Sequence, residues 1–211
     1  MNFAQIVQYA LSGITVGSIY AITAVGFNII YNCTGIINFA QGEFLIVGAM
    51  TAISLTEVVP LPLAILGAVL ITTVIGGLIE VVFIRRVSDA SILRLIVITI
   101  GLSILMREGM LHVWDEKVRS LAYFTGTATT TVSILGAHIS PQVLWVLGVS
   151  AVIVAALTLF FRLTTTGRAM RACADNRMAA RLCGINDRWM VTLSFMLSAG
   201  IGALAGCVIS P

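Results

Sequence analysis

The sequence predicts an all-α protein, a polytopic bundle of transmembrane helices, and three observations support this prediction. Hydrophobic residues occupy 59% of the 211 positions, whereas a soluble domain carries roughly 45–50%. Charged residues make up only 10% of the chain, and the mean hydropathy is +1.06. The apolar residues also gather into runs close to the length of about 20 residues that a membrane-crossing helix needs.

Composition also excludes several classes of protein. One soluble core could not bury so many apolar side chains, which disfavours a soluble enzyme and a disordered chain. The net charge of +3 is too small to indicate a nucleic acid or another polyanion as a ligand. Lipid is therefore the expected surroundings of most of the chain.

Uncharged runs place the expected membrane spans. No residue from Met1 to Gly42 is charged, and turn-forming residues at 31–35 divide this stretch between two spans. Pro60 and Pro62 suit the start of a third span, which Arg85 and Arg86 close. The six expected spans cover residues 5–30, 36–56, 58–79, 90–110, 139–161 and 189–210.

The span at 90–110 is the least regular of the six. Only Leu95 to Met106 separate Arg94 from Arg107, which corresponds to about 18 Å of helix. The segment crosses the membrane if both arginines extend toward its surfaces, and a helix buried among its neighbours is the alternative.

Basic residues predict the orientation of the bundle, because arginine and lysine are enriched on the cytoplasmic side. With the N-terminus outside, only Arg107, Lys117 and Arg119 fall on the outer side, within or beside an expected extracytoplasmic loop at 111–139. The nine arginines on the inner side are Arg85, Arg86, Arg94, Arg162, Arg168, Arg171, Arg177, Arg181 and Arg188. In the outer loop, the threonine-rich stretch 125–132 favours a short hairpin, with a mobile connector as an equal alternative.

Small residues recur at every fourth position in three of the spans. Such stripes allow helix backbones to approach closely, so we expect a compact bundle. The stripes are Gly13, Gly17 and Ala21; Ala64, Ala68, Thr72 and Gly76; and Ser194, Ser198, Gly202 and Gly206.

The inner segment 162–188 is unusually basic and too long for a simple turn. Its alanines and apolar residues predict two short helices that break near Asp175 and Asn176, either of which could cap the second helix. Gly184 is placed to end that second helix. Such a helix can press into a groove on a partner protein, whereas a loop that only sets the membrane topology is the alternative at even odds.

Residues 178–184, Met-Ala-Ala-Arg-Leu-Cys-Gly, resemble the Glu-Ala-Ala-x-x-x-Gly loop of ABC importer permeases, with Met178 in the place of the glutamate. Residues 166–172 and 184–186 are similar to the branched-chain amino acid permeases of that superfamily, as are residues 17–21, 38–43 and 48–49 in the N-terminal half. Permeases of this family continue beyond the position of Pro211 with further spans, so we expect a C-terminally truncated member.

The resemblance implies a single permease domain, residues 1–211, in a bacterial cytoplasmic membrane. It implies as partners two cytoplasmic ATPase subunits, a second permease subunit and an external substrate-binding protein that delivers leucine, isoleucine or valine. The segment 162–188 would dock on the ATPase, and arginine at Ala179, Ala180 or Gly184 is expected to block docking without unfolding the bundle. The implied ATPase contacts are Gly167, Arg168, Arg171, Ala172, Asp175, Asn176, Ala179, Ala180, Leu182, Gly184, Ile185 and Asn186.

A polar cluster near the start of the second span is the candidate for the translocation path. Asn38 and Gln41 are three positions apart, which predicts one shared helix face, and Glu43 lies beside them. An acid within the membrane is costly and by default faces a polar cavity or a partner. The alternative of equal weight is that Glu43 caps a local turn or pairs with a neighbouring helix. Glu80 is expected to be solvated or paired with Arg85 or Arg86.

No catalytic pattern is present in the sequence. It has no glycine-rich phosphate loop ending in Lys-Ser or Lys-Thr, so we expect this subunit to bind no cofactor and its partners to hydrolyse ATP. The four cysteines show no metal-ligand spacing, which predicts neither zinc nor disulfides. Three alternatives stay open: a related permease for urea or short amides, an ion-coupled secondary transporter that uses Glu43, and a membrane scaffold without transport activity.

Overall fold

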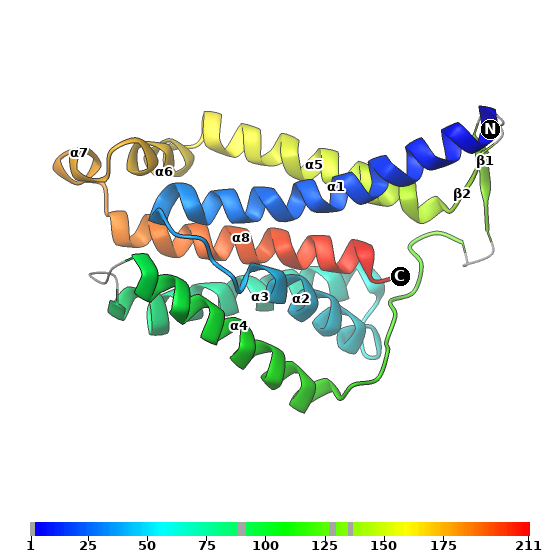
Figure 1. The fold of residues 1–211 in the computed structure, drawn as a ribbon, viewed down its shortest axis with the longest axis horizontal. Helices are drawn as coiled ribbons and strands as arrows, with labels where there is room; N and C mark the ends of the chain where they lie inside the picture. The colour runs from blue at the N-terminus through cyan, green and yellow to red at the C-terminus, as the bar shows by residue number, and fades with distance from the viewer. Residues whose placement is uncertain (1–2, 88–91, 127–129, 135–136) are drawn as a thin grey trace.

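The computed structural model describes residues 3–87, 92–126, 130–134 and 137–211, and it confirms the all-α class (Figure 1). Long helices lie side by side and form a bundle. The elements in chain order are α1 (Phe3–Thr34), α2 (Gln41–Thr56), α3 (Leu61–Ile79), a π-helical turn (Glu80–Ile84), a 3-10 turn (Arg85–Val87), α4 (Ile92–Trp114), β1 (Val132–Ile134), β2 (Ala137–Ile139), α5 (Pro141–Leu163), α6 (Thr165–Asp175), α7 (Arg177–Leu182) and α8 (Asp187–Ile209).

Five helices of the described residues are long and apolar enough to cross a membrane, one fewer than the six expected spans. They are α1, α3 together with the turns that follow it, α4, α5 and α8. The expected span at 36–56 is helical only from Gln41, and its sixteen residues measure about 24 Å. Gly35 is the reason, because its positive φ of 74° ends α1 and sends residues 36–40 back into the bundle as irregular chain.

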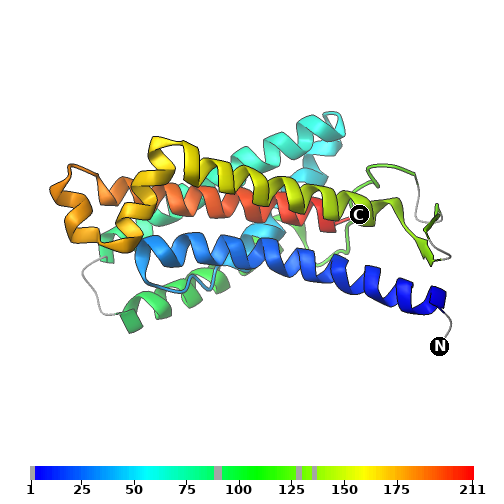
Figure 2. The ribbon, with the colours of Figure 1, turned by 90° about the horizontal axis from the view of Figure 1, so that it is seen from above.

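Helix α8 forms the centre of the bundle. It packs against α1, α2 and α3 along its length and also contacts α5 and α6. In the most apolar part of α8, 72% of the residues are buried, whereas the corresponding value for α4 is 11%. Figure 2 shows α8 running along the middle of the molecule. The core therefore surrounds α8, and α4 lies at the edge.

Two of the three small-residue stripes lie at helix contacts, as predicted. Ala64, Ala68 and Thr72 of α3 are fully buried. Gly76 of α3 packs so closely on α8 that a Cβ atom there would lie 2.5 Å from the Cβ of Ala199. Gly206 of α8 lies directly against the backbone carbonyl of Leu45 in α2.

The third stripe does not lie at a contact. No atom outside α1 lies within 4 Å of the position that a Cβ atom would take on Gly13 or Gly17. The prediction of a packed stripe in α1 is therefore wrong for this chain by itself, because the N-terminal half of α1 extends beyond α8 (Figure 2).

The two ends of the bundle differ in character. Helices α6 and α7 lie at one end, where α4 and α8 begin, and the N-terminus and the β1–β2 hairpin lie at the other (Figure 1). In the hairpin, Val132 pairs with Ile139 and Ile134 pairs with Ala137, so the loop 111–139 contains a hairpin, but it begins only at the end of the threonine-rich stretch 125–132 on which the prediction was based. Residues 127–129 of that loop lie outside the described residues.

We expect that Gly206→Ala destabilises the bundle by about 1–3 kcal/mol, because the new methyl group must push the α2 backbone away from α8. Gly13→Ala is the matched control, since it adds the same methyl group to a helix at a site with open space. The measurement is the midpoint of thermal unfolding of each purified variant in one detergent. Equal midpoints would contradict the close approach of α2 and α8.

Candidate functional site

The basic segment 162–188 forms two short helices, as predicted, and side-chain caps define where each begins. Thr164 Oγ1 accepts a hydrogen bond of 2.9 Å from the N–H of Gly167 at the start of α6. Asn176 Oδ1 accepts one of 3.0 Å from the N–H of Ala179 at the start of α7. Asn176, and not Asp175, is thus the residue that caps the second helix.

Gly184 ends α7, also as predicted. Its φ is +82°, and the N–H of Ile185 donates a hydrogen bond of 3.0 Å to the carbonyl of Ala180. The N–H of Gly184 donates to the carbonyl of Arg181 at 2.9 Å, which completes a Schellman motif. Asn186 then caps α8 by accepting a hydrogen bond from the N–H of Trp189. Arginine at Gly184 would consequently strain the backbone. The effect of this substitution on docking would therefore be mixed with its effect on the fold.

The outer surface of α7 is apolar between charged neighbours. Leu182 is 84% exposed and Met178 is 68% exposed, and Ala179 is also exposed. The other expected ATPase contacts that are exposed are Arg168, Arg171, Asp175, Asn176, Gly184 and Asn186. An exposed apolar pair on a short, well-capped helix is the arrangement expected of a segment that enters a groove of another protein.

Four of the expected contacts face the bundle wholly or in part. Gly167 is buried where the backbone of Phe160 and Phe161 leaves no room for a side chain. Ala180 is only 4% exposed, and the half-buried Ala172 and Ile185 pack on the same apolar cluster. These residues shape the segment instead of forming its outer surface. Arginine at Ala180 would therefore disturb the fold, contrary to expectation.

An ion-pair cluster joins α7 to α8. The Asp187 carboxylate accepts hydrogen bonds from Arg181 at 2.6 Å and lies 3.1 Å from Arg177 Nε. Burial raises the pKa of the nearby Cys173 thiol, and the negative charge of Asp187 acts in the same direction. Cys173 consequently stays protonated. Because the ion pairs of Asp187 connect α7 to α8, α7 cannot move far without moving the start of α8 as well.

The three residues of the N-terminal polar cluster are buried, but they have separate partners. Asn38 lies before α2, where its Oδ1 accepts a hydrogen bond of 3.2 Å from the N–H of Ala40, so the prediction of a shared helix face is wrong. Gln41 is completely buried, and its Oε1 accepts a hydrogen bond of 2.6 Å from Ser198 of α8. Gln41 therefore connects α2 to the central helix.

Glu43 pairs with α4, the kind of contact expected in the alternative in which it meets a neighbouring helix, and this contact does not test a role in the translocation path. Its Oε1 accepts hydrogen bonds from Ser103 at 2.8 Å and from Arg107 at 3.1 Å. The Glu43 side chain is 4% exposed and that of Arg107 is 66% exposed. Among the described residues, Glu43 Oε2 and Asn38 Nδ2 have no hydrogen-bond partner although both atoms are buried.

Glu80 is paired with Arg85, one of the two expected partners, and is not solvated. Its Oε2 accepts hydrogen bonds from Arg85 at 3.2 Å and from Thr192 of α8 at 2.7 Å. Glu80 is 2% exposed, so its charge is compensated inside the protein. This group joins the C-terminal end of α3 to α8.

Sequence reasoning did not identify several residues that organise these sites. Met178 departs from the resembled motif, which gives no reason to expect a contact there, but its high exposure makes it part of the outer surface of α7. Ser103 and Thr192 bond to carboxylates 60 and 112 residues away, and no local pattern marks such contacts. Among the residues that were missed, only Asp187 could have been identified from the sequence, because an acid directly before the last apolar run suits the first turn of a helix.

Comparison with known proteins places these features in a family. The sequence model of the family described as "Branched-chain amino acid transport system / permease component" matches residues 9–211. The LivH permease of a high-affinity branched-chain amino acid transport system in Escherichia coli is 31% identical over 222 residues, covering 99% of this chain and 71% of LivH. LivH of Salmonella typhimurium is 30% identical over 226 residues, with the same coverage. BraD of Pseudomonas aeruginosa, a permease of the same kind of system, is 30% identical over 214 residues, covering 96% of this chain and 70% of BraD. No solved structure matches the chain significantly.

We expect that Arg107→Met destabilises the bundle more than the double variant Glu43→Gln with Arg107→Met, because the single change leaves a buried carboxylate without its cation. The coupling free energy should be of the order of 1 kcal/mol, since solvent or a polar headgroup can reach Arg107. Unfolding midpoints of the two single variants and the double variant, converted to free energies, provide the measurement. Strictly additive effects would contradict the ion pair.

Proposed function

The chain belongs to the permease family of branched-chain amino acid transport systems, and from this premise we propose that it is the membrane-spanning subunit of an ABC importer that moves leucine, isoleucine or valine into a bacterial cell. It is a multi-pass membrane protein, and the part of the chain that the structure describes contains five helices of membrane-crossing length. The observation that carries the proposal is the match over residues 9–211 to a family of transport permeases.

ATP hydrolysis belongs to separate subunits in this proposal. The exposed apolar pair Met178 and Leu182, flanked by arginines, is the surface that enters the ATPase. The apolar side chains would fill a groove, and the surrounding arginines would meet acidic groups at its rim. This subunit itself would bind no cofactor and perform no chemistry.

The contacts of α7 support a mechanical role. Closure of the ATPase pair would push α6 and α7, and the bonds from Asp187 to Arg177 and Arg181 would pass the displacement to α8. Because α8 packs on α1, α2 and α3, the spans would tilt together between outward-open and inward-open states. A second permease subunit and an external binding protein would complete the transporter, and the binding protein would supply most of the selectivity.

The polar cluster of Asn38, Gln41 and Glu43 would border the translocation path. Two observations support this role: residues 36–40 are not helical although they lie within the bundle, and Asn38 and Glu43 each keep a buried polar atom without a partner among the described residues. Irregular backbone at membrane depth is tolerated where it is buried in protein or lines a water-filled cavity.

The function is tested by uptake into vesicles that contain the chain with its ATPase subunits, second permease and binding protein. We expect leucine uptake that requires ATP and continues when the proton gradient is abolished. The double variant Met178→Ser with Leu182→Ser should lower uptake and reduce co-purification of the ATPase about tenfold or more, because docking would bury both of these exposed apolar side chains.

Val58→Ser is the control for ATPase co-purification, since Val58 is as exposed as Leu182, at 84%, and lies beyond the outer end of α2. Its co-purification should be unchanged. Uptake driven by the proton gradient without ATP would contradict the importer assignment. Wild-type recovery of the ATPase by the α7 variant would contradict only the docking surface.

The exposure of the cysteines gives a test of orientation. Cys183 is exposed, whereas Cys33, Cys173 and Cys207 are buried. A membrane-impermeant maleimide should therefore label Cys183 in inverted membrane vesicles and leave right-side-out vesicles unlabelled. Cys183→Ser should abolish the labelling. Labelling of right-side-out vesicles at Cys183 would place segment 162–188 outside the cell.

A further inference from the structure

A polar cavity of about 190 Å³ lies at the arginine-rich end of the bundle. Its walls come from the end of α1, the turns that follow α3, the start of α4, and from α7 and α8. Six of the side chains that line it carry charge: Arg85, Arg177, Arg181, Arg188, Glu80 and Asp187. The proposed transport function uses the ion pairs of Asp187 in the wall of this cavity, but it assigns no ligand to the cavity itself.

The cavity has an excess of positive charge. Four arginines face two carboxylates, which leaves a net charge of +2. Glu80 pairs with Arg85, and Asp187 is shared between Arg177 and Arg181. No carboxylate of the described residues forms an ion pair with Arg188. Arg85 Nε is also buried, and it has no hydrogen-bond partner among the described residues. The cavity therefore offers guanidinium N–H donors to an anion.

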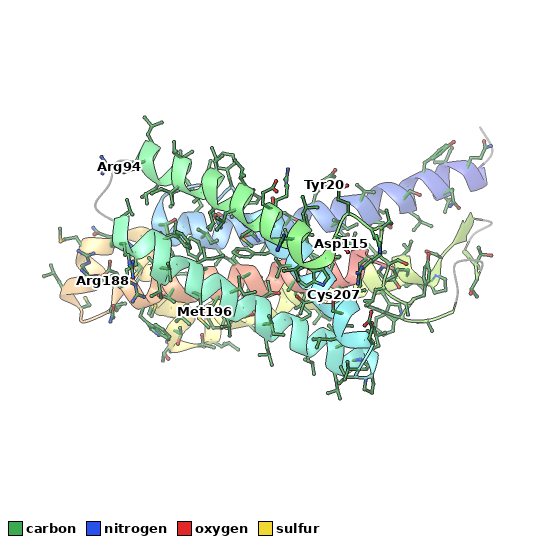
Figure 3. All side chains as sticks on the ribbon, turned by 90° about the horizontal axis from the view of Figure 1, so that it is seen from below. Tyr20, Arg94, Asp115, Arg188, Met196 and Cys207 are labelled. Atoms are coloured by element: carbon green, nitrogen blue, oxygen red, sulfur yellow. The ribbon has the colours of Figure 1, made fainter. Side chains whose placement is uncertain are left out.

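The position of the cavity identifies the kind of anion. Arg94 and Arg188 lie at the same end of the molecule (Figure 3), the end predicted to face the cytoplasm. Ile36, Ile84 and Leu95 form an apolar part of the wall. Phe83 is 40% exposed and Leu93 is 74% exposed, so the same turn and the same helix also carry exposed apolar side chains outside the cavity. A ligand with an anionic head and an apolar remainder would satisfy both parts.

We propose that this cavity binds the phosphate-bearing headgroup of an anionic phospholipid from the inner leaflet. Arginine presents paired N–H groups that match phosphate oxygens, and basic pockets between helices on the cytoplasmic side of a membrane protein suit such headgroups. Arg188 provides the principal contact, and Arg85 Nε provides a second donor. The acyl chains lie against the exposed apolar surface of α4 and of the turns after α3.

A bound headgroup would connect the start of α4 to α8, which have few direct contacts, beside the bonds of Glu80 and Arg85 to Thr192 that already join the turns after α3 to α8. The Arg85 side comes from the chain between α3 and α4, and the Arg177, Arg181 and Arg188 side comes from α7 and α8. The lipid would hold the start of α4 near α8. Anionic lipid should therefore raise the thermal stability of the protein, and a zwitterionic lipid should not.

The test uses the purified full chain in nanodiscs of phosphatidylcholine with increasing phosphatidylglycerol. Lipid retained by the protein is counted by native mass spectrometry, and the unfolding midpoint is recorded in parallel. We expect selective retention of phosphatidylglycerol and a rising midpoint. Arg188→Gln should weaken retention about fivefold, the effect of removing one arginine near an anionic surface. Arg168→Gln, an exposed arginine of the same segment outside the cavity, should leave retention unchanged.

Two further arms distinguish other occupants. Inorganic phosphate is added to nanodiscs of pure phosphatidylcholine, and a midpoint that rises with phosphate but not with phosphatidylglycerol would overturn the lipid assignment in favour of a soluble anion. Equal retention by wild type and Arg188→Gln would also overturn it. If Arg188→Gln kept lipid selectivity but lost the ATPase in co-purification, the cavity would belong to the protein interface and the proposal would fall. None of these outcomes depends on the transported substrate.

Discussion

Close backbone contact between α8 and its neighbours α2 and α3 is the constraint on which the rest of the bundle depends. Helices gain no hydrophobic free energy from meeting in lipid, so their association must come from packing and from buried polar contacts. Gly76 and Gly206 allow this approach because any side chain at either position would collide with the facing helix. Once α8 is held in this way, its buried Thr192 and Ser198 are positioned to meet partners on α3 and α2.

Each buried carboxylate of the described residues meets an arginine, and each pair joins two elements or stiffens one. Glu43 joins α2 to α4, and Asp187 joins α7 to α8. Glu80 pairs within its own turn and adds a bond to α8. A charge inside a membrane protein is expensive unless it is paired, so these pairs fix the relative positions of elements that otherwise contact weakly. Helix α4 is the clearest case, since most of its surface is uncovered.

Much of the fold could be predicted from the sequence because local rules decide it. Apolar runs predicted α1, α3, α5 and α8, and residue types alone predicted the break before α7 and the end at Gly184. The start of α2 could not be predicted in this way. Residues 36–40 are apolar enough to continue a helix, and their irregular path depends on Gly35 and on the turn at Asn38, which act together.

The candidate site was predictable only in part for a similar reason. The caps of α6 and α7 lie within a few residues of the groups they satisfy, so their roles can be inferred from residue type and position. Whether Ala180 faces inward or Glu43 meets Arg107 depends on contacts between distant segments. The small-residue stripe in α1 shows the opposite failure. Its local pattern is typical of a packed helix face, but no helix of the described residues packs on Gly13 or Gly17.

The π-helical turn at Glu80–Ile84 has a consequence for how the chain can vary in length. In this turn the N–H of Arg85 bonds to the carbonyl of Glu80, five residues earlier, which brings both side chains to the same side of the turn. In a regular α-helix each residue advances by about 100°, so side chains five residues apart point about 140° away from each other and those four residues apart only about 40°. A regular α-helix with the same residues would therefore turn Arg85 away from the carboxylate and leave the buried Glu80 with only the hydroxyl of Thr192. The π-helical turn allows the two residues to pair across five positions, and deletion of one residue between them should be tolerated better than insertion of one, because four-residue spacing keeps both side chains on one face.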